Sequence, residues 1–195
     1  MAKKSLPAAG VTSGFTSRLT LIVDAQGWKK IPRLNARLQQ AAAATLAHLP
    51  ARLQIPFNAT LLLTGDARVR RLNHDFRGID KPTNVLSFPQ FEPRRLPELG
   101  KCPEPVEIGD IAIALAYSSK EAKENNKLLI NHIIHLVVHG LLHLFGYDHI
   151  MDAQANRMEK LETTIMRSLG LPDPYAGEAG ARPDAKAKKK NRRRP

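Results

Sequence analysis

Short apolar runs and longer helical stripes alternate along this chain and predict both strands and helices. Runs rich in Leu, Ile, Val or Ala indicate strands at 19–25, 60–65, 84–88 and 111–116. Apolar residues recurring every three or four positions indicate helices at 32–50, 66–78, 118–125, 128–145 and 152–170. Strands and helices in this order do not alternate as in a doubly wound protein. We therefore expect one α+β domain, a small mixed β-sheet covered by helices.

Prolines and aspartates mark the ends of several of these elements. Pro32 can open the first helix and Pro50 can end it, while Asp66 and Asp152 are expected to cap later helices. Pro89 cannot donate a ladder hydrogen bond, so the strand before it is expected at a sheet edge. The following stretch to residue 108 holds further prolines, which favours a long loop of the kind that covers a functional cleft.

Basic residues dominate the composition and gather at the C-terminal end. The chain of 195 residues has a formal net charge of +12. We expect a disordered segment at 1–17, one domain at 18–176, and a disordered basic tail at 177–195. From residue 182 onward, eight basic residues face one acid. Such a tail favours RNA binding without specificity, here through Lys188, Lys189, Lys190, Arg192, Arg193 and Arg194.

The single cysteine and the most apolar stretch of the chain indicate in which cellular compartment the protein is expected. Cys102 is the single cysteine, which excludes an intramolecular disulfide and suits a reducing cytoplasm. The most apolar stretch, 128–145, carries four histidines and an asparagine, which a lipid-facing helix would tolerate only at high cost. It is therefore expected to be a buried core helix, and we expect a cytoplasmic protein with no membrane partner.

The stretch HGLLHLFGYDH, residues 139–149, has the ligand spacing of a zinc site. His139 and His143 lie four residues apart in a predicted helix, so their rings project from one face on adjacent turns. Gly146 can adopt a positive φ, end the helix and return His149 to the same ion. Three imidazoles and a water form a catalytic zinc site with an open position. We therefore predict a zincin-like metal-binding helix that holds one zinc ion per chain.

The same spacing forms the ligand half of the metzincin protease motif, but Gly140 stands where those proteases carry a catalytic glutamate. Loss of a placed general base costs roughly 10²–10⁴-fold in rate. A zinc metalloprotease therefore remains only an alternative. A structural zinc in a non-catalytic ribosome-assembly factor is a second alternative, although structural sites are usually closed by four protein ligands.

Two residues before this motif and one inside it have predicted places around the site. His135 is two turns from His143, roughly 12 Å, too far to share the ion easily, and is instead expected to line the site behind the ligands. Asp148 could orient a ligand imidazole or cap the turn. His132 is expected to border solvent.

The residues HGLLHLFGYDH resemble the HGxLHLxGYDH motif of the YbeY family of rRNA-maturation factors. FRGIDKPTNVLSFP, residues 76–89, and GDIAIA, from residue 109, are similar to two further blocks of that family. The resemblance implies a single-strand-specific, zinc-dependent endoribonuclease. Its substrate would be 16S rRNA in the small ribosomal subunit, for 3′-end maturation and late 70S ribosome quality control. It also implies zinc ligands at His139, His143 and His149.

The family's functional arginine falls on Arg77. A guanidinium can bind two nonbridging phosphate oxygens at once, which suits charge developing during phosphodiester cleavage. We expect a zinc-bound water as the nucleophile, with its pKa lowered to about 7. Attack by the RNA 2′-hydroxyl is the alternative and would leave a cyclic phosphate. No residue stands out as the general acid or base.

Overall fold

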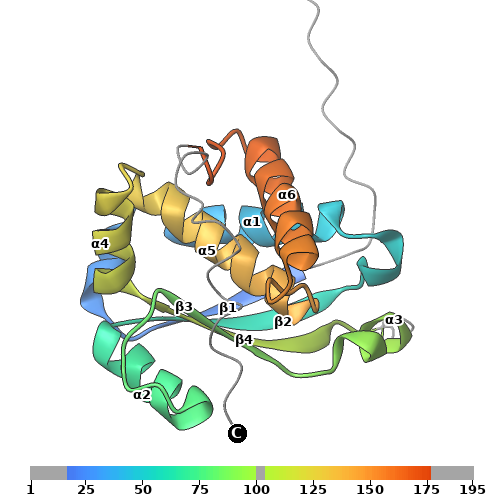
Figure 1. The fold of residues 1–195 in the computed structure, drawn as a ribbon, viewed down its shortest axis with the longest axis horizontal. Coiled ribbons are helices and arrows are strands. Elements are labelled where there is room, and N and C mark those ends of the chain that lie inside the picture. Colours follow the sequence, from blue (N-terminus) through green and yellow to red (C-terminus); the bar gives the residue numbers. More distant parts are fainter. Residues whose placement is uncertain (1–16, 100–103, 177–195) are drawn as a thin grey trace, which may run out of the picture.

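A four-stranded mixed sheet forms the centre of the computed structural model, which describes residues 17–99 and 104–176 (Figure 1). Its strands lie in the order β1-β2-β4-β3. β1, β2 and β4 are parallel and β3 runs antiparallel to β4. The strands are β1 (Ser17–Val23), β2 (Phe57–Thr64), β3 (Val85–Pro89) and β4 (Val106–Ala114). The predicted mixed sheet is confirmed, and β3, which ends at Pro89, is an edge strand as predicted.

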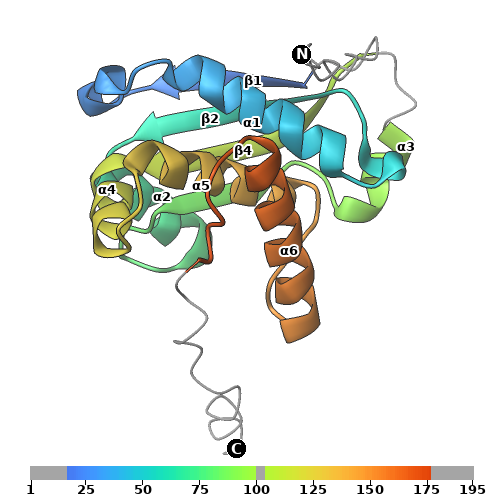
Figure 2. The same cartoon turned by 90° about the horizontal axis from the view of Figure 1, so that it is seen from above.

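Helices cover the sheet unequally on its two faces (Figures 1 and 2). On one face α5 packs on β3 and β4, α1 packs on α5 and β1, and α6 contacts both helices. On the other face α2 contacts β3 and β4. α4 stands at the end of the sheet, where it joins β4 to α5 and packs on α5 (Figure 1). The bounds are α1 (Leu34–His48), α2 (Asp66–Arg77), α4 (Leu115–Glu124), α5 (Leu129–Leu144) and α6 (Asp152–Ser168). This arrangement is the expected single α+β domain.

Short helical turns lie in the proline-rich loop and at two other places in the chain. The proline-rich loop after β3 contains a 3₁₀ turn at Pro93–Arg95 and the single-turn α3 (Leu96–Leu99). Two further 3₁₀ turns lie at Gln26–Lys30 and Ala51–Leu53. The loop is anchored because the side chain of Leu96 is fully buried.

The core lies between the sheet and α1, α5 and α6, and α5 is its most buried helix. Ile133, Val137 and Leu141 of α5 have no exposed surface, and the rings of Phe57 and Phe145 pack edge to face with centroids 5.2 Å apart. The prediction of a buried core helix is confirmed. Within the described ranges no single helix is long and apolar enough to cross a membrane. Of the described helices, only α4 and α5 taken together reach that length and apolar composition, and the two helices are bent by 114° relative to each other.

Both predicted aspartate caps are wrong. Gly65 and Met151 hold the N-cap positions, and Asp66 and Asp152 are the first residues of α2 and α6. Oδ1 of Asp66 instead accepts the backbone N–H of Tyr117 at 3.0 Å, in the first turn of α4. Because α2 and α4 start side by side at the end of the sheet, the Asp66 carboxylate accepts a backbone N–H from the first turn of α4 and none from its own helix.

The predicted terminal segments fall almost wholly outside the described residues. Ser17, assigned to the N-terminal segment, already begins β1. Residues 1–16 and 177–195, including the six basic tail residues predicted to bind RNA, are not described, so those predictions stay predictions.

Candidate metal centre and its cavity

Three histidines converge where α5 ends. His139 and His143 project from adjacent turns of α5, and their Nε2 atoms are 3.0 Å apart. One nitrogen from each of His139, His143 and His149 lies within 4.8 Å of the others. This is the only such group of three among the residues that the structure describes. The three residues predicted as metal ligands are therefore brought together.

The turn after α5 returns His149 to the helix. The N–H of Gly146 donates to His143 O, and the N–H of Tyr147 donates to Leu142 O, which is the hydrogen-bond pattern of a Schellman C-cap. Gly146 has φ +84°, and a Cβ at this position would come within 2.2 Å of Pro93. Glycine is required here both by the backbone conformation and by the packed loop.

Hydrogen bonds on the far ring nitrogens orient two of these imidazoles. Nδ1 of His143 lies 2.9 Å from the carbonyl oxygen of Tyr147, which can only accept, so this nitrogen carries the proton. Nδ1 of His139 lies 2.8 Å from a carboxylate oxygen of Glu162. Each Nε2 is then left with a lone pair facing the other. A cation between them relieves that repulsion, so the donor set fits a metal such as zinc, for which Zn–N bonds are about 2.0–2.1 Å.

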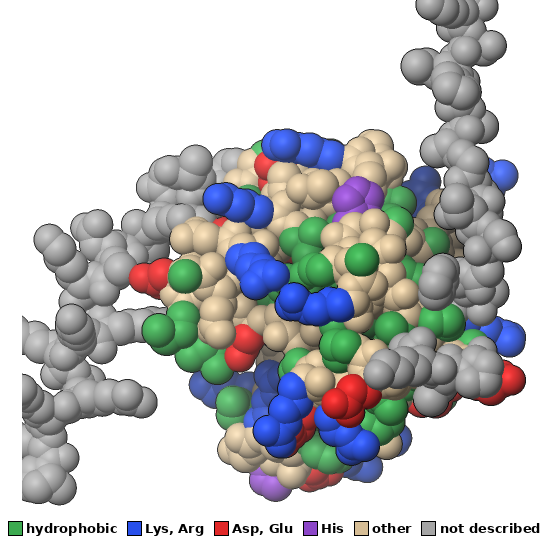
Figure 3. All heavy atoms as spheres, turned by 90° about the vertical axis from the view of Figure 1, so that its right-hand side faces the viewer, with side chains coloured by type: hydrophobic (Ala, Val, Ile, Leu, Met, Phe, Trp, Pro, Cys, Tyr) green, Lys and Arg blue, Asp and Glu red, His purple; other side chains and the backbone are tan. Residues whose placement is uncertain are grey.

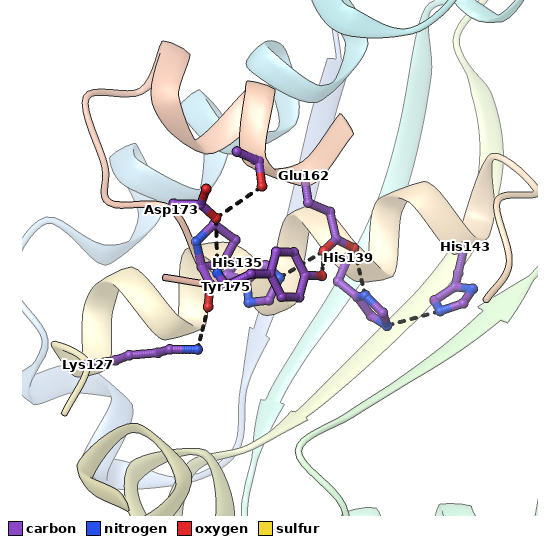
Figure 4. A network of polar contacts seen from close by, with 9 residues as sticks. Lys127, His135, His139, His143, Glu162, Asp173 and Tyr175 are labelled. Atoms are coloured by element: carbon purple, nitrogen blue, oxygen red, sulfur yellow. Dashed lines mark hydrogen bonds and ion pairs between the residues drawn. The ribbon is translucent and has the colours of Figure 1, made fainter. Parts of the chain in front are cut away.

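Glu162 is a site residue that the sequence reasoning missed (Figure 4). Its side chain is fully buried and accepts hydrogen bonds from His139, from Nε2 of His135 at 3.0 Å, and from the Tyr175 hydroxyl. Burial opposes its ionisation, but the hydrogen bonds from His135 and His139 outweigh it and lower its pKa to about 2. A signal existed in the sequence. Glu162 lies four residues after Met158 and three before Ile165, on the apolar face of α6.

Three further residues that were predicted to lie around the site are His135, Asp148 and His132. His135 hydrogen-bonds to Glu162, and its ring lies edge-on to that of His139 with the centroids 6.3 Å apart. Oδ1 of Asp148 accepts the backbone N–H of the adjacent His149 at 2.7 Å, and the predicted role of Asp148 at the site stays a prediction. The prediction that His132 borders solvent is wrong. Its side chain is 5% exposed and hydrogen-bonded to Glu121, because α4 packs over the start of α5.

A cavity of about 590 Å³ opens over the three histidines. Arg77, the last residue of α2, also lines it and is itself exposed. Gly78, with φ +69°, ends α2 at this point. The remaining walls come from β3 and the loops beside it, and from the turn after α5. Arg77 and the histidines therefore face one space, although they are more than sixty residues apart in the chain.

The environment keeps His143 in its neutral form. Burial is the main cause, and the neighbouring His139 and His149 add to it, so that the pKa of His143 falls to about 4. A neutral imidazole with a free Nε2 is the form that binds a metal ion.

Packing explains the glycine at position 140. A Cβ on Gly140 would lie 3.0 Å and 3.1 Å from two side-chain carbons of Ile111 and 3.2 Å from Oγ of Ser87. This position therefore faces β3 and β4, and the small residue allows α5 to approach the sheet closely. Any larger residue there would require the side chains of Ile111 and Ser87 to shift.

A family model and the named relatives agree on one family. The family model described as Endoribonuclease YbeY matches residues 22–170, a range that includes Arg77 and the three histidines. A protein named Endoribonuclease YbeY from Bradyrhizobium diazoefficiens is 44% identical over 160 residues, covering 82% of this chain and 86% of that protein. Its namesake from Allorhizobium ampelinum is 43% identical over 162 residues, covering 81% and 94%. The solution structure of a Thermotoga maritima protein is similar with a TM-score of 0.48 and 20% identity, covering 85% of this chain and all of that one.

Proposed function

This chain belongs to the YbeY family of endoribonucleases, and on that premise we propose that it cuts single-stranded RNA at a zinc ion bound by His139, His143 and His149. Its proposed substrate is 16S rRNA in the small ribosomal subunit, whose 3′ end it would mature, with a further part in 70S ribosome quality control. The observation that carries the proposal is the convergence of three imidazole nitrogens and Arg77 on one cavity.

The proposed chemistry divides between the ion and the protein. A bound zinc ion would supply a water of lowered pKa and polarise the phosphate. Glu162 and the Tyr147 carbonyl hold the His139 and His143 rings with Nε2 toward the site. Arg77 would bind nonbridging oxygens of the scissile phosphate and neutralise the charge that develops on them.

The nucleophile distinguishes two forms of the mechanism. Attack by water leaves a linear phosphate end, whereas attack by the RNA 2′-hydroxyl leaves a cyclic phosphate. Identification of the product ends by mass spectrometry separates them. The packing of Gly140 against Ile111 leaves the protease alternative without the glutamate base that it needs.

Cleavage of a labelled single-stranded rRNA fragment by protein of measured metal content tests the proposal. We expect about one zinc per chain, cleavage by wild type, and no cleavage by His143→Ala that keeps its thermal transition. The same RNA annealed into a duplex should resist. Equal cutting by wild type and by His143→Ala would overturn the proposed metal chemistry. Absence of cutting by zinc-loaded wild type, on naked rRNA and on ribosomal subunits, would favour a non-catalytic assembly factor.

A further inference from the structure

A second hollow of about 330 Å³ adjoins the metal cavity. The two spaces share part of their walls, namely Pro93, Gly146, Tyr147 and Asp148. The turn after α5 therefore borders both spaces.

Three arginines surround this second hollow. Arg52 comes from the 3₁₀ turn after α1, Arg94 from the turn that precedes α3, and Arg157 from α6. We call these three residues and the space between them the arginine hollow. Figure 3, viewed from the side on which α3 lies, shows Lys and Arg side chains across the middle of that face. The three segments are distant in sequence, so the fold alone brings these charges together.

The charge of the arginine hollow is only partly compensated. Arg94 forms an ion pair of 2.7 Å with Glu92, but both side chains are mostly exposed, at 83% and 64%. Such an exposed pair contributes only about 0–1 kcal/mol, so a phosphate can displace the carboxylate. Asp148 is the one acid in the wall, and its carboxylate already accepts a backbone N–H. Within residues 17–99 and 104–176, neither Arg52 nor Arg157 has an ion pair.

An aromatic ring lies between the two spaces. The guanidinium of Arg157 lies over the Tyr147 ring, 5.5 Å from its centroid. The carbonyl of the same Tyr147 accepts the hydrogen bond from His143. A stacked ring and guanidinium offer a flat surface for a nucleobase, and single-stranded nucleic acids are held by this combination of aromatic stacking and positive charge.

We propose that the arginine hollow is a phosphate-binding subsite for the RNA strand, occupied by a nucleotide next to the one cut at the histidines. This inference rests on the proposed function and adds the path of the substrate to it. Arg52, Arg94 and Arg157 bind the phosphate, and Tyr147 with Arg157 supports the adjoining base. The arginine hollow thus increases substrate affinity and leaves the chemical step to the metal cavity.

A charge-matched pair of variants tests this subsite. R52Q/R94Q/R157Q removes the three arginines of the hollow, and R18Q/R37Q/R71Q removes three exposed arginines that line neither space. For single-stranded RNA cleavage we expect the first variant to raise KM about tenfold or more with kcat nearly unchanged. The slope of log affinity against log salt, measured with metal-free protein, should decrease by about 0.7, the value for the one phosphate contact that is lost.

The control variant and a conservative change make the result specific. R18Q/R37Q/R71Q should raise KM much less, although its net charge falls equally. Arg157→Lys should retain most of the affinity that Arg157→Gln loses, because the positive charge is kept. Thermal melts of all variants exclude unfolding as the cause, and exposed arginines can be changed with little loss of stability.

The outcomes separate the subsite from the proposed function. If wild type cuts RNA and the two triple variants have the same KM and salt slope, the subsite is overturned while the function stands. If wild type does not cut RNA but R52Q/R94Q/R157Q alone loses RNA affinity, the function fails and the arginine hollow stands as an RNA-binding site. A fall in kcat without a rise in KM would also overturn the subsite as proposed.

Discussion

Nδ1 of His139 and Oε1 of Glu162 are joined by a hydrogen bond of 2.8 Å between α5 and α6. The carboxylate is fully buried and is held on its other side by His135 and Tyr175 (Figure 4). A histidine whose far nitrogen binds a carboxylate is fixed in its tautomer and is a more basic ligand. The orientation of the proposed metal ligand therefore depends on a helix that supplies no ligand itself.

Glu162→Gln should weaken zinc binding by about 10- to 100-fold, because a neutral amide is a poorer partner for the His139 N–H. Competition with a chromophoric chelator measures the affinity. Tyr175→Phe should have a smaller effect in the same direction, since it removes one donor to Glu162 and leaves the charge. Glu124→Gln, an exposed change on α4, is the control. Wild-type zinc affinity in Glu162→Gln would show that the carboxylate does not tune the ligand.

Arg77→Ala should lower kcat for RNA cleavage by about 10²–10³-fold, because the charge developing on the phosphate would lose its guanidinium partner. Arg77→Lys should recover part of the rate, since an ammonium supplies the charge without the two-pronged geometry. Arg71→Ala, on the same helix but outside the cavity wall, should cut normally. Single-turnover kinetics make the comparison, and an unchanged rate in Arg77→Ala would remove this residue from the chemistry.

Gly140→Glu should reduce the free energy of unfolding by at least about 3 kcal/mol, because a charged side chain would be forced against Ile111 and Ser87. It should confer no peptidase activity on casein. Ala43→Glu, at an exposed position of α1, should change stability by less than about 0.5 kcal/mol. Urea denaturation measures both. A stable Gly140→Glu protein would mean that the sheet does not limit this position.

Glu121→Gln should destabilise the protein at pH 7 by about 1–2 kcal/mol, since a charged hydrogen-bond acceptor is lost. The hydrogen bond from His132 is the main cause that lowers the pKa of Glu121; burial opposes it, and Asn84 adds a second bond of 2.8 Å. A lowered pKa stabilises the fold above the pKa of the unfolded chain, and that contribution is lost as the pH falls through the folded pKa.

The stability difference between wild type and Glu121→Gln should therefore be constant near neutral pH and shrink below about pH 4.5. Urea titrations of metal-free protein at pH 7 and pH 3.5 measure it, so that metal loss does not contribute. A difference that grows on acidification would contradict this origin of the stability.

Removal of residues 182–195 should weaken binding to single-stranded RNA and flatten its salt dependence, because eight basic residues are lost with one acid. Cleavage positions should not change, since the tail offers affinity without base-specific contacts. Filter binding across a salt series, with the full chain as reference, measures the effect. Equal affinity at low salt would exclude the tail as an RNA-binding arm.

The convergence of the three histidines and the place of the edge strand could be predicted from sequence because both depend on local geometry. Helical spacing places residues four apart on one face, and Gly146 permits a turn whose hydrogen bonds reach back only five residues. The place of β3 at the edge likewise follows from the missing N–H of Pro89. Such relationships are fixed by backbone sterics within one or two turns of chain.

Other features of this protein are decided only by tertiary packing. Glu162 hydrogen-bonds to His139, which lies 23 positions away in the sequence. Asp66 accepts a hydrogen bond from α4 rather than from α2. His132 is buried by the packing of α4. The arginine hollow likewise joins three distant segments. The sequence by itself determined which side chains could bind a metal. The packing of α4, α5 and α6 with the sheet decided which groups hydrogen-bond to those side chains, because partners distant in sequence depend on how whole helices and strands pack.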